Sequence, residues 1–129
     1  MDLLEQIRLD YQHFPDQQSY HLYAEDVYFK DPLNEFRGVQ RYQAMIGFIG
    51  RWFRDIDLQL HRIEYLPPRR IRTQWTLNWV APLPWRPPMS IPGHSDLELG
   101  EEGKIIAHID YWDCSRLAVL KQLFLKTSH

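Results

Sequence analysis

Apolar residues recur at helical spacing in the first part of the chain and at every second position in much of the rest. The first helical stripe predicts a helix over residues 3–13, which Asp2 caps together with Glu5 and which ends before Pro15. A longer stripe predicts a second, clearer helix of about four turns. Its apolar members are Val39, Tyr42, Met45, Ile46, Ile49, Trp52 and Phe53.

The segment between these helices combines a short helix with a short strand. Asp16 can cap a helix over residues 17–24, because an aspartate side chain accepts from the free N–H groups of the first turn. Residues 27–29 are typical of a strand, and Asp31-Pro32 ends it.

From Asp57 onward the hydrophobic period is two, which predicts strands. They lie near residues 58–66, 71–80, 95–99 and 104–113. Ser115 or Asp113 can cap a last helix over residues 116–126. Its expected inward residues are Leu117, Leu120, Leu123 and Phe124. Helices followed by meandering strands indicate an α+β fold with an antiparallel sheet.

Residues 82–89 are rich in proline, which removes the backbone donors that a central strand needs. We interpret the segment as an irregular hairpin or an edge strand. Two further readings stay open: a stiff lid over a pocket mouth, and a polyproline patch for a partner.

The composition is that of one globular domain spanning residues 1–129. Aromatic residues make up 14% of the chain, which indicates a bulky core, a wide apolar cavity or an interface. The net charge of -2, with no basic run longer than Arg69-Arg70, disfavours nucleic-acid binding. Cys114 is the single cysteine, which fits a reducing compartment. Without a signal-peptide pattern or a membrane-length apolar stretch, we expect a soluble cytoplasmic protein.

Residues 22–32 resemble the first strand of nuclear transport factor 2-like domains, and the ketosteroid isomerases carry a closely similar segment. More specifically, the chain resembles an uncharacterised family, domain of unknown function 2358, known from cyanobacteria and plant plastids. The matching pieces are residues 23–32, 34–38, Tyr42, Arg72, 75–76, 84–85, Gly93, Ser95, 103–105, His108 and Asp110. The resemblance implies a cone-shaped (cystatin-like) α+β fold in which three N-terminal helices close the concave side of a strongly bent antiparallel sheet. It also implies a pocket between helices and sheet, and a homodimer formed through the outer face of the sheet.

Asp31 is the first candidate catalytic residue. In the ketosteroid isomerases the matching aspartate takes a proton from the carbon beside a carbonyl. A carboxylate in an apolar cavity loses solvation, so its pKa rises and it becomes a usable base near neutrality. The alternative is structural, because Asp-Pro commonly ends a strand with the aspartate bonded to nearby backbone.

His108 and Asp110 are two residues apart on the last predicted strand, so they share one face with Trp112. Register with the isomerases puts this face on the concave side. Two ionisable groups there need either a mutual hydrogen bond or a catalytic role. The strand also resembles the last strand of limonene-epoxide hydrolases, where the aspartate matching Asp110 helps to activate water. The opposite face is apolar, which motivates the expected dimer surface. It comprises Ile105, Ala107, Ile109 and Tyr111.

Neither catalytic set is complete. Ser95 stands where the isomerases carry a second carboxyl, and Thr76 and Asn78 stand where the epoxide hydrolases carry Arg and Asp. Trp75 and Trp79 share one face of their strand, and Thr76 and Asn78 share the other; the pattern leaves open which face is concave. A polar inner face predicts a hydrogen-bonding pocket, and an inner tryptophan face suits a flat hydrophobic ligand.

These observations support three functions. The first is a binding module for a small apolar or carbonyl-containing ligand. The second is a cofactor-free isomerase, dehydratase or hydrolase that uses Asp31 with His108 or Asp110. The third is a protein-interaction module with a filled core. The residues expected to line the pocket are Tyr28, Thr76, Asn78, Ser95 and Trp112. The scattered histidines predict no metal site, and we expect no cofactor.

Overall fold

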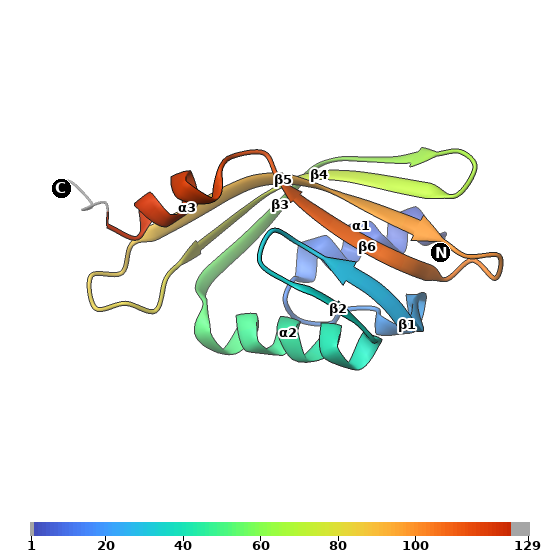
Figure 1. Ribbon diagram of the computed structural model, residues 1–129, viewed down its shortest axis with the longest axis horizontal. Coiled ribbons are helices and arrows are strands. Elements are labelled where there is room, and N and C mark those ends of the chain that lie inside the picture. The colour runs from blue at the N-terminus through green and yellow to red at the C-terminus, as the bar shows by residue number, and fades with distance from the viewer. Residues whose placement is uncertain (1, 125–129) are drawn as a thin grey trace.

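A computed structural model describes residues 2–124 of the chain, and within them six strands form one sheet in the order β2-β1-β6-β5-β4-β3 (Figure 1). In chain order the elements are α1 (Leu3–His13), the 3-10 turn η1 (Tyr20–Leu22), β1 (Tyr23–Lys30), β2 (Glu35–Arg37), α2 (Val39–Trp52), β3 (Arg54–Leu66), β4 (Arg70–Val80), β5 (Pro88–Leu99), β6 (Ile105–Trp112) and α3 (Arg116–Gln122). Neighbouring strands are antiparallel except β1 and β6, which are parallel, so the expected antiparallel sheet is in fact mixed.

Helices α1 and α2 lie on the same side of the sheet (Figure 1). The Asp2 side chain accepts from the backbone N–H of Glu5 at 2.9 Å, as the capping pattern predicts, and α1 spans the predicted residues. Gly38 precedes α2 with φ of +113°, a conformation that side chains with a Cβ rarely adopt. Buried Ile7 of α1 and Ile46 of α2 anchor their helices to two separate core clusters.

The prediction of a short helix over residues 17–24 is wrong. Only the single turn η1 forms, and Tyr23 already belongs to β1, where it pairs with Ile105. Asp10 of α1 replaces the expected cap, because its carboxylate accepts from both the N–H and the hydroxyl of Ser19. This tether and the strand pairing leave too few residues for a stable helix.

Strand β4 alternates strictly between the two faces of the sheet. Trp75 and Trp79 are buried on the concave face. Arg70 and Arg72 point to the convex face, where they form ion pairs with Glu98 and Asp96 of β5. The tryptophans therefore face the helices, which settles the question that the sequence left open.

One residue of the apolar face that we expected on the outside of β6 points into the core instead. Ile105 is fully buried in the core cluster with Ile7, whereas Ile106 is about half exposed. The pairing with β5 shifts between Glu98 and Leu99, so β6 carries an extra residue at this point. Such a bulge reverses the side-chain alternation and turns Ile105 inward.

Strand β5 begins at Pro88, seven residues before the predicted start. Its pairing with β6 reaches only to Gly93, so the proline-containing end has no neighbour on that side. Gln122 of α3 takes the place of the missing strand: its side-chain amide accepts from the N–H of Ser90 and donates to the Ser90 carbonyl.

Ser115, one of the two residues predicted as possible caps, is the N-cap of α3. The predicted inward face of this helix is wrong, because Val119 is the buried residue. Leu117, Leu120 and Phe124 are exposed, whereas Leu123 packs against the core cluster with Val119, as predicted. The helix packs at one end of β5 rather than under the sheet, so it has a narrow contact face (Figure 1). The last predicted residues of this helix, 125–126, lie outside the described part of the chain.

Candidate functional site

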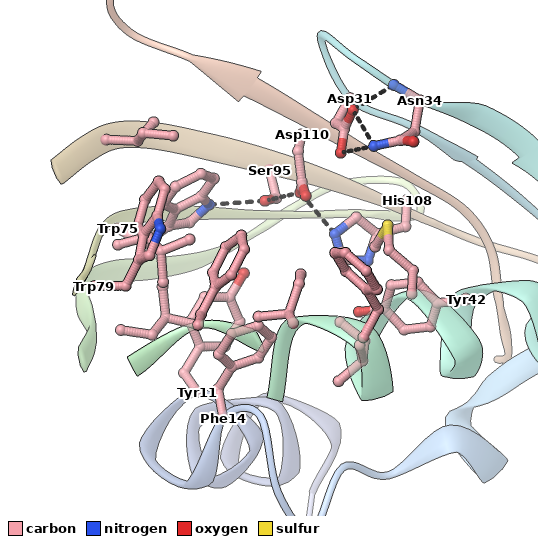
Figure 2. Close-up of a pocket in the computed structure, with 18 of the residues that line it drawn as sticks. Tyr11, Phe14, Asp31, Asn34, Tyr42, Trp75, Trp79, Ser95, His108 and Asp110 are labelled. Carbon is pink, nitrogen blue, oxygen red and sulfur yellow. Dashed lines mark hydrogen bonds and ion pairs between the residues drawn. The ribbon is translucent and has the colours of Figure 1, made fainter. Parts of the chain in front are cut away.

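A cavity of about 620 Å³ lies between the concave face of the sheet and helices α1 and α2. Its wall is mostly apolar, and Trp75, Trp79 and Phe14 contribute to it (Figure 2). Trp112 and Phe53 line it as well. Phe53, which ends α2, stacks on Trp79 with ring centroids 5.0 Å apart. Large aromatic side chains therefore form part of a wall whose other apolar residues are aliphatic.

One wall of the cavity is polar, and its side chains form a continuous line across three strands (Figure 2). Trp75 of β4 donates from Nε1 to Oγ of Ser95 on β5 at 2.8 Å. Ser95 donates to Oδ1 of Asp110 on β6 at 2.5 Å, and Nε2 of His108 lies 2.7 Å from the same oxygen. We call Trp75, Ser95, Asp110 and His108 the polar wall.

Two tyrosines extend the polar wall toward the helices. The hydroxyl of Tyr23 lies 3.2 Å from Nδ1 of His108, and the hydroxyl of Tyr42 lies 3.4 Å from that of Tyr23. Burial raises the pKa of both phenols well above the usual range. They consequently stay neutral and remain able to donate hydrogen bonds.

Tyr11 of α1 forms a polar contact with the sheet beside the polar wall. Its hydroxyl lies 2.7 Å from Oγ1 of Thr73 on β4, and burial raises its pKa as well. Tyr11 also lines the cavity, so helix and sheet meet across a neutral hydrogen bond at this point.

Asp31 lines the same cavity, yet its carboxylate is engaged in the turn between β1 and β2. Oδ1 accepts from the N–H groups of Leu33 and Asn34, at 2.7 and 2.6 Å. The side-chain amide of Asn34 lies 3.1 Å from each carboxylate oxygen. These bonds are those of a side chain that stabilises a turn.

The structure brings Asp31, His108, Asp110 and Trp112 together around one cavity, and Ser95 joins them. Their catalytic roles stay predictions.

The structure does not place Tyr28, Thr76 and Asn78 in this cavity. Thr76 and Asn78 lie on the convex face, because the alternation of β4 turns its tryptophans inward, and Thr76 Oγ1 lies 2.7 Å from Nε2 of His61. Tyr28 borders a second depression, on the far side of Asp31 and Asp110, where its hydroxyl donates to Glu35 at 2.6 Å.

Sequence reasoning missed Tyr23 and Tyr42. Both occur in apolar stripes, where their spacing is that of core residues, and only the folded chain brings them to His108. A signal was nonetheless present: a tyrosine on an inner face usually needs a partner for its hydroxyl.

Within residues 2–124, no group of three or more His, Cys, Asp or Glu side chains is arranged to hold a metal ion. None of the described helices has the length and apolar character that crossing a bilayer requires.

The fold is that of nuclear transport factor 2-like proteins. A hypothetical protein from Catenulispora acidiphila with a ketosteroid isomerase-like fold, solved in complex with trimethylamine, is similar with a TM-score of 0.74 and 15% identity over 94% of this chain and 93% of that one. A putative SnoaL-like polyketide cyclase from Shewanella denitrificans gives a TM-score of 0.71 and 15% identity over 96% and 98%. A LEH-like epoxide hydrolase from M. tuberculosis gives a TM-score of 0.71 and 14% identity over 94% of this chain and 88% of that one. At such identities the likeness establishes the fold alone.

No curated protein matches the sequence. The model of a family described as uncharacterized conserved protein (DUF2358) matches residues 1–108, which include most of the elements around the cavity. The chain therefore belongs to the DUF2358 family.

Proposed function

We propose that this protein binds a small, largely apolar molecule in the cavity, with the polar end of the molecule against Asp110 and His108. The observation that carries the proposal is the combination of an open volume of about 620 Å³, a mostly apolar lining and the polar wall. Cavities of about 300–1,000 Å³ that are apolar apart from a few convergent polar groups are typical of ligand sites.

Two further facts support a ligand site over an interaction module with a filled core. The polar wall is already hydrogen-bonded within the protein, so a rigid set of groups is in place before a ligand arrives. Similar structures are described as polyketide cyclases and as a complex with trimethylamine, which are roles that involve small molecules.

Filling the cavity tests the proposal. Ile49 of α2 lines the cavity, and Ile49→Trp adds bulk there, whereas Gln43→Trp places the same side chain on the exposed face of the same helix. The neutral dye N-phenyl-1-naphthylamine, which fluoresces in apolar surroundings, should bind the wild type and the Gln43 variant alike. Binding to Ile49→Trp should be at least about tenfold weaker, a loss of about 1.4 kcal/mol. Equal binding by all three chains would contradict the proposal.

A second candidate function is cofactor-free acid–base catalysis with Asp110 as the base. The observation that favours it is that Oδ1 of Asp110 is held by Ser95 and His108 while the carboxylate borders the cavity. A base held in this way is oriented toward a substrate by its neighbours. Asp31 is the weaker candidate, since the turn engages its carboxylate.

A screen of small carbonyl compounds and isoprenoid fragments for turnover tests this second function. On any substrate found, Asp110→Asn should lower the rate by about 10²–10⁴, the usual contribution of a general base. Asp31→Asn should lower it far less. The reverse order would give the role of base to Asp31, and an unchanged rate in both variants would remove both residues from the chemistry.

A further inference from the structure

The direction of each hydrogen bond in the polar wall follows from its first member. The indole of Trp75 can only donate, so Oγ of Ser95 accepts from it and uses its own proton for Asp110. A carboxylate can only accept, so Nε2 of His108 carries the proton that faces Asp110. In a neutral imidazole Nδ1 is then an acceptor, to which the hydroxyl of Tyr23 donates.

This order leaves one open position, and that position is an acceptor. Both donors to Asp110 meet Oδ1, and among the described residues no group donates to Oδ2. The Asp110 side chain is 23% exposed, and it borders both the cavity and the second depression. A ligand that reaches this carboxylate therefore finds an oxygen that needs a donor.

The charges around the cavity also favour a ligand that presents a hydrogen-bond donor and carries no negative charge. Its lining residues include the carboxylates Asp10, Asp31 and Asp110, and none of those in the described part is Lys or Arg. His108 is the one lining group there that can become cationic, and both of its ring nitrogens already face protein partners. A carboxylate or phosphate on the ligand would meet negative charge without a cation to balance it.

The aromatic wall adds a second attraction for positive charge. Trp75, Trp112 and Tyr42 line the cavity from three different elements. The faces of such rings carry negative potential, which attracts ammonium groups, above all where water is excluded. The apolar volume would accept the hydrocarbon part of the same molecule.

We propose that the ligand of this cavity is an apolar amine, whose protonated nitrogen donates to the open oxygen of Asp110. The inference rests on the proposed function and gives that function a ligand class. It excludes fatty acids and other apolar anions as the preferred occupants.

Three probes that share one skeleton test the inference: 4-biphenylmethylamine, 4-biphenylmethanol and biphenyl-4-carboxylate. Calorimetric titration at pH 7 should rank the amine first and the carboxylate last, with roughly tenfold or more between them, because hydrogen bonds to charged groups are the strong ones. Asp110→Asn keeps an oxygen for Ser95 and His108 and removes the charge. It should abolish the preference for the amine over the alcohol.

Asp57→Asn is the matched control, because it removes one exposed carboxylate outside the cavity and should leave the ranking unchanged. The ranking on the wild-type chain decides the inference even if Asp110→Asn folds poorly. Carboxylate binding equal to or tighter than amine binding overturns it. Equal binding of alcohol and amine also overturns it and leaves the proposed function intact. No binding of any probe overturns both.

Discussion

Ser95 joins Trp75 to Asp110, so its replacement by alanine tests whether the polar wall is a single unit. Ser95 is 1% exposed, and its hydroxyl takes part in two hydrogen bonds, one from the Trp75 indole at 2.8 Å and one to the Asp110 carboxylate at 2.5 Å. A bond between neutral groups contributes about 0.5–1.5 kcal/mol, and a bond to a charged group about 1.5–3 kcal/mol. Ser95→Ala should therefore lower the free energy of unfolding by about 2–4 kcal/mol.

Urea unfolding measures this loss. With a urea dependence of about 2 kcal/mol per molar, the middle of the usual range, the midpoint should fall by about 1–2 M. Ser90→Ala is the control on the same strand, because the Ser90 hydroxyl makes no hydrogen bond among the described residues, and it should change stability by less than about 0.5 kcal/mol. A loss in Ser95→Ala no larger than in the control would refute the view that Ser95 holds the polar wall together.

Three further predictions concern the scaffold. Gly93→Ala should lower the free energy of unfolding in urea by about 1–3 kcal/mol, because the added Cβ would lie 2.5 Å from the Trp75 ring. Gly47→Ala is the control and should not destabilise the chain, because nothing lies within 4 Å of its added Cβ. Equal effects of the two substitutions would contradict this packing. The hydrogen bond and charge of Arg72 lower the pKa of Asp96 in the folded chain. The ion pair of Asp96 with Arg72 should therefore contribute fully to stability above the ordinary aspartate pKa of about 4. This contribution should be lost as the pH falls through the lowered pKa of folded Asp96. Asp96→Asn should flatten this acid dependence in pH-dependent unfolding, and an unchanged slope would exclude the pair as its source. The chain should form a homodimer through the convex face of the sheet, and a monomer in light scattering at micromolar concentration would contradict it.

Local signals were sufficient for the elements that depend on short-range chemistry. The Asp2 cap and the apolar stripe of α1 predict its bounds, and the stripe of α2 covers the whole helix and extends one residue beyond its end, to Phe53. The strict alternation of β4 predicts that Trp75 and Trp79 share a face. In each case the determining interactions lie within a few residues of one another.

The remaining features depend on contacts between distant segments. Alternation alone cannot say which face of β4 is concave, since both faces satisfy the same period. The inward turn of Ile105 arises from a bulge, which shows only in the pairing with β5. The bond between Tyr23 and His108 joins residues 85 positions apart, so the two appear in the sequence as unrelated core positions. The extension of the polar wall by Tyr23 and Tyr42 therefore depends on the fold.

The location of a bound probe distinguishes a ligand site in the cavity from binding at the protein surface. Nuclear Overhauser effects between 4-biphenylmethanol and the protein's methyl groups report which side chains lie within a few ångströms of the ring. We expect contacts with Ile46, Leu77 and Ile91, which line the cavity. Contacts confined to Leu117 and Leu120, which are exposed on α3, would show that the probe binds the surface of that helix and would contradict a ligand site between the helices and the sheet.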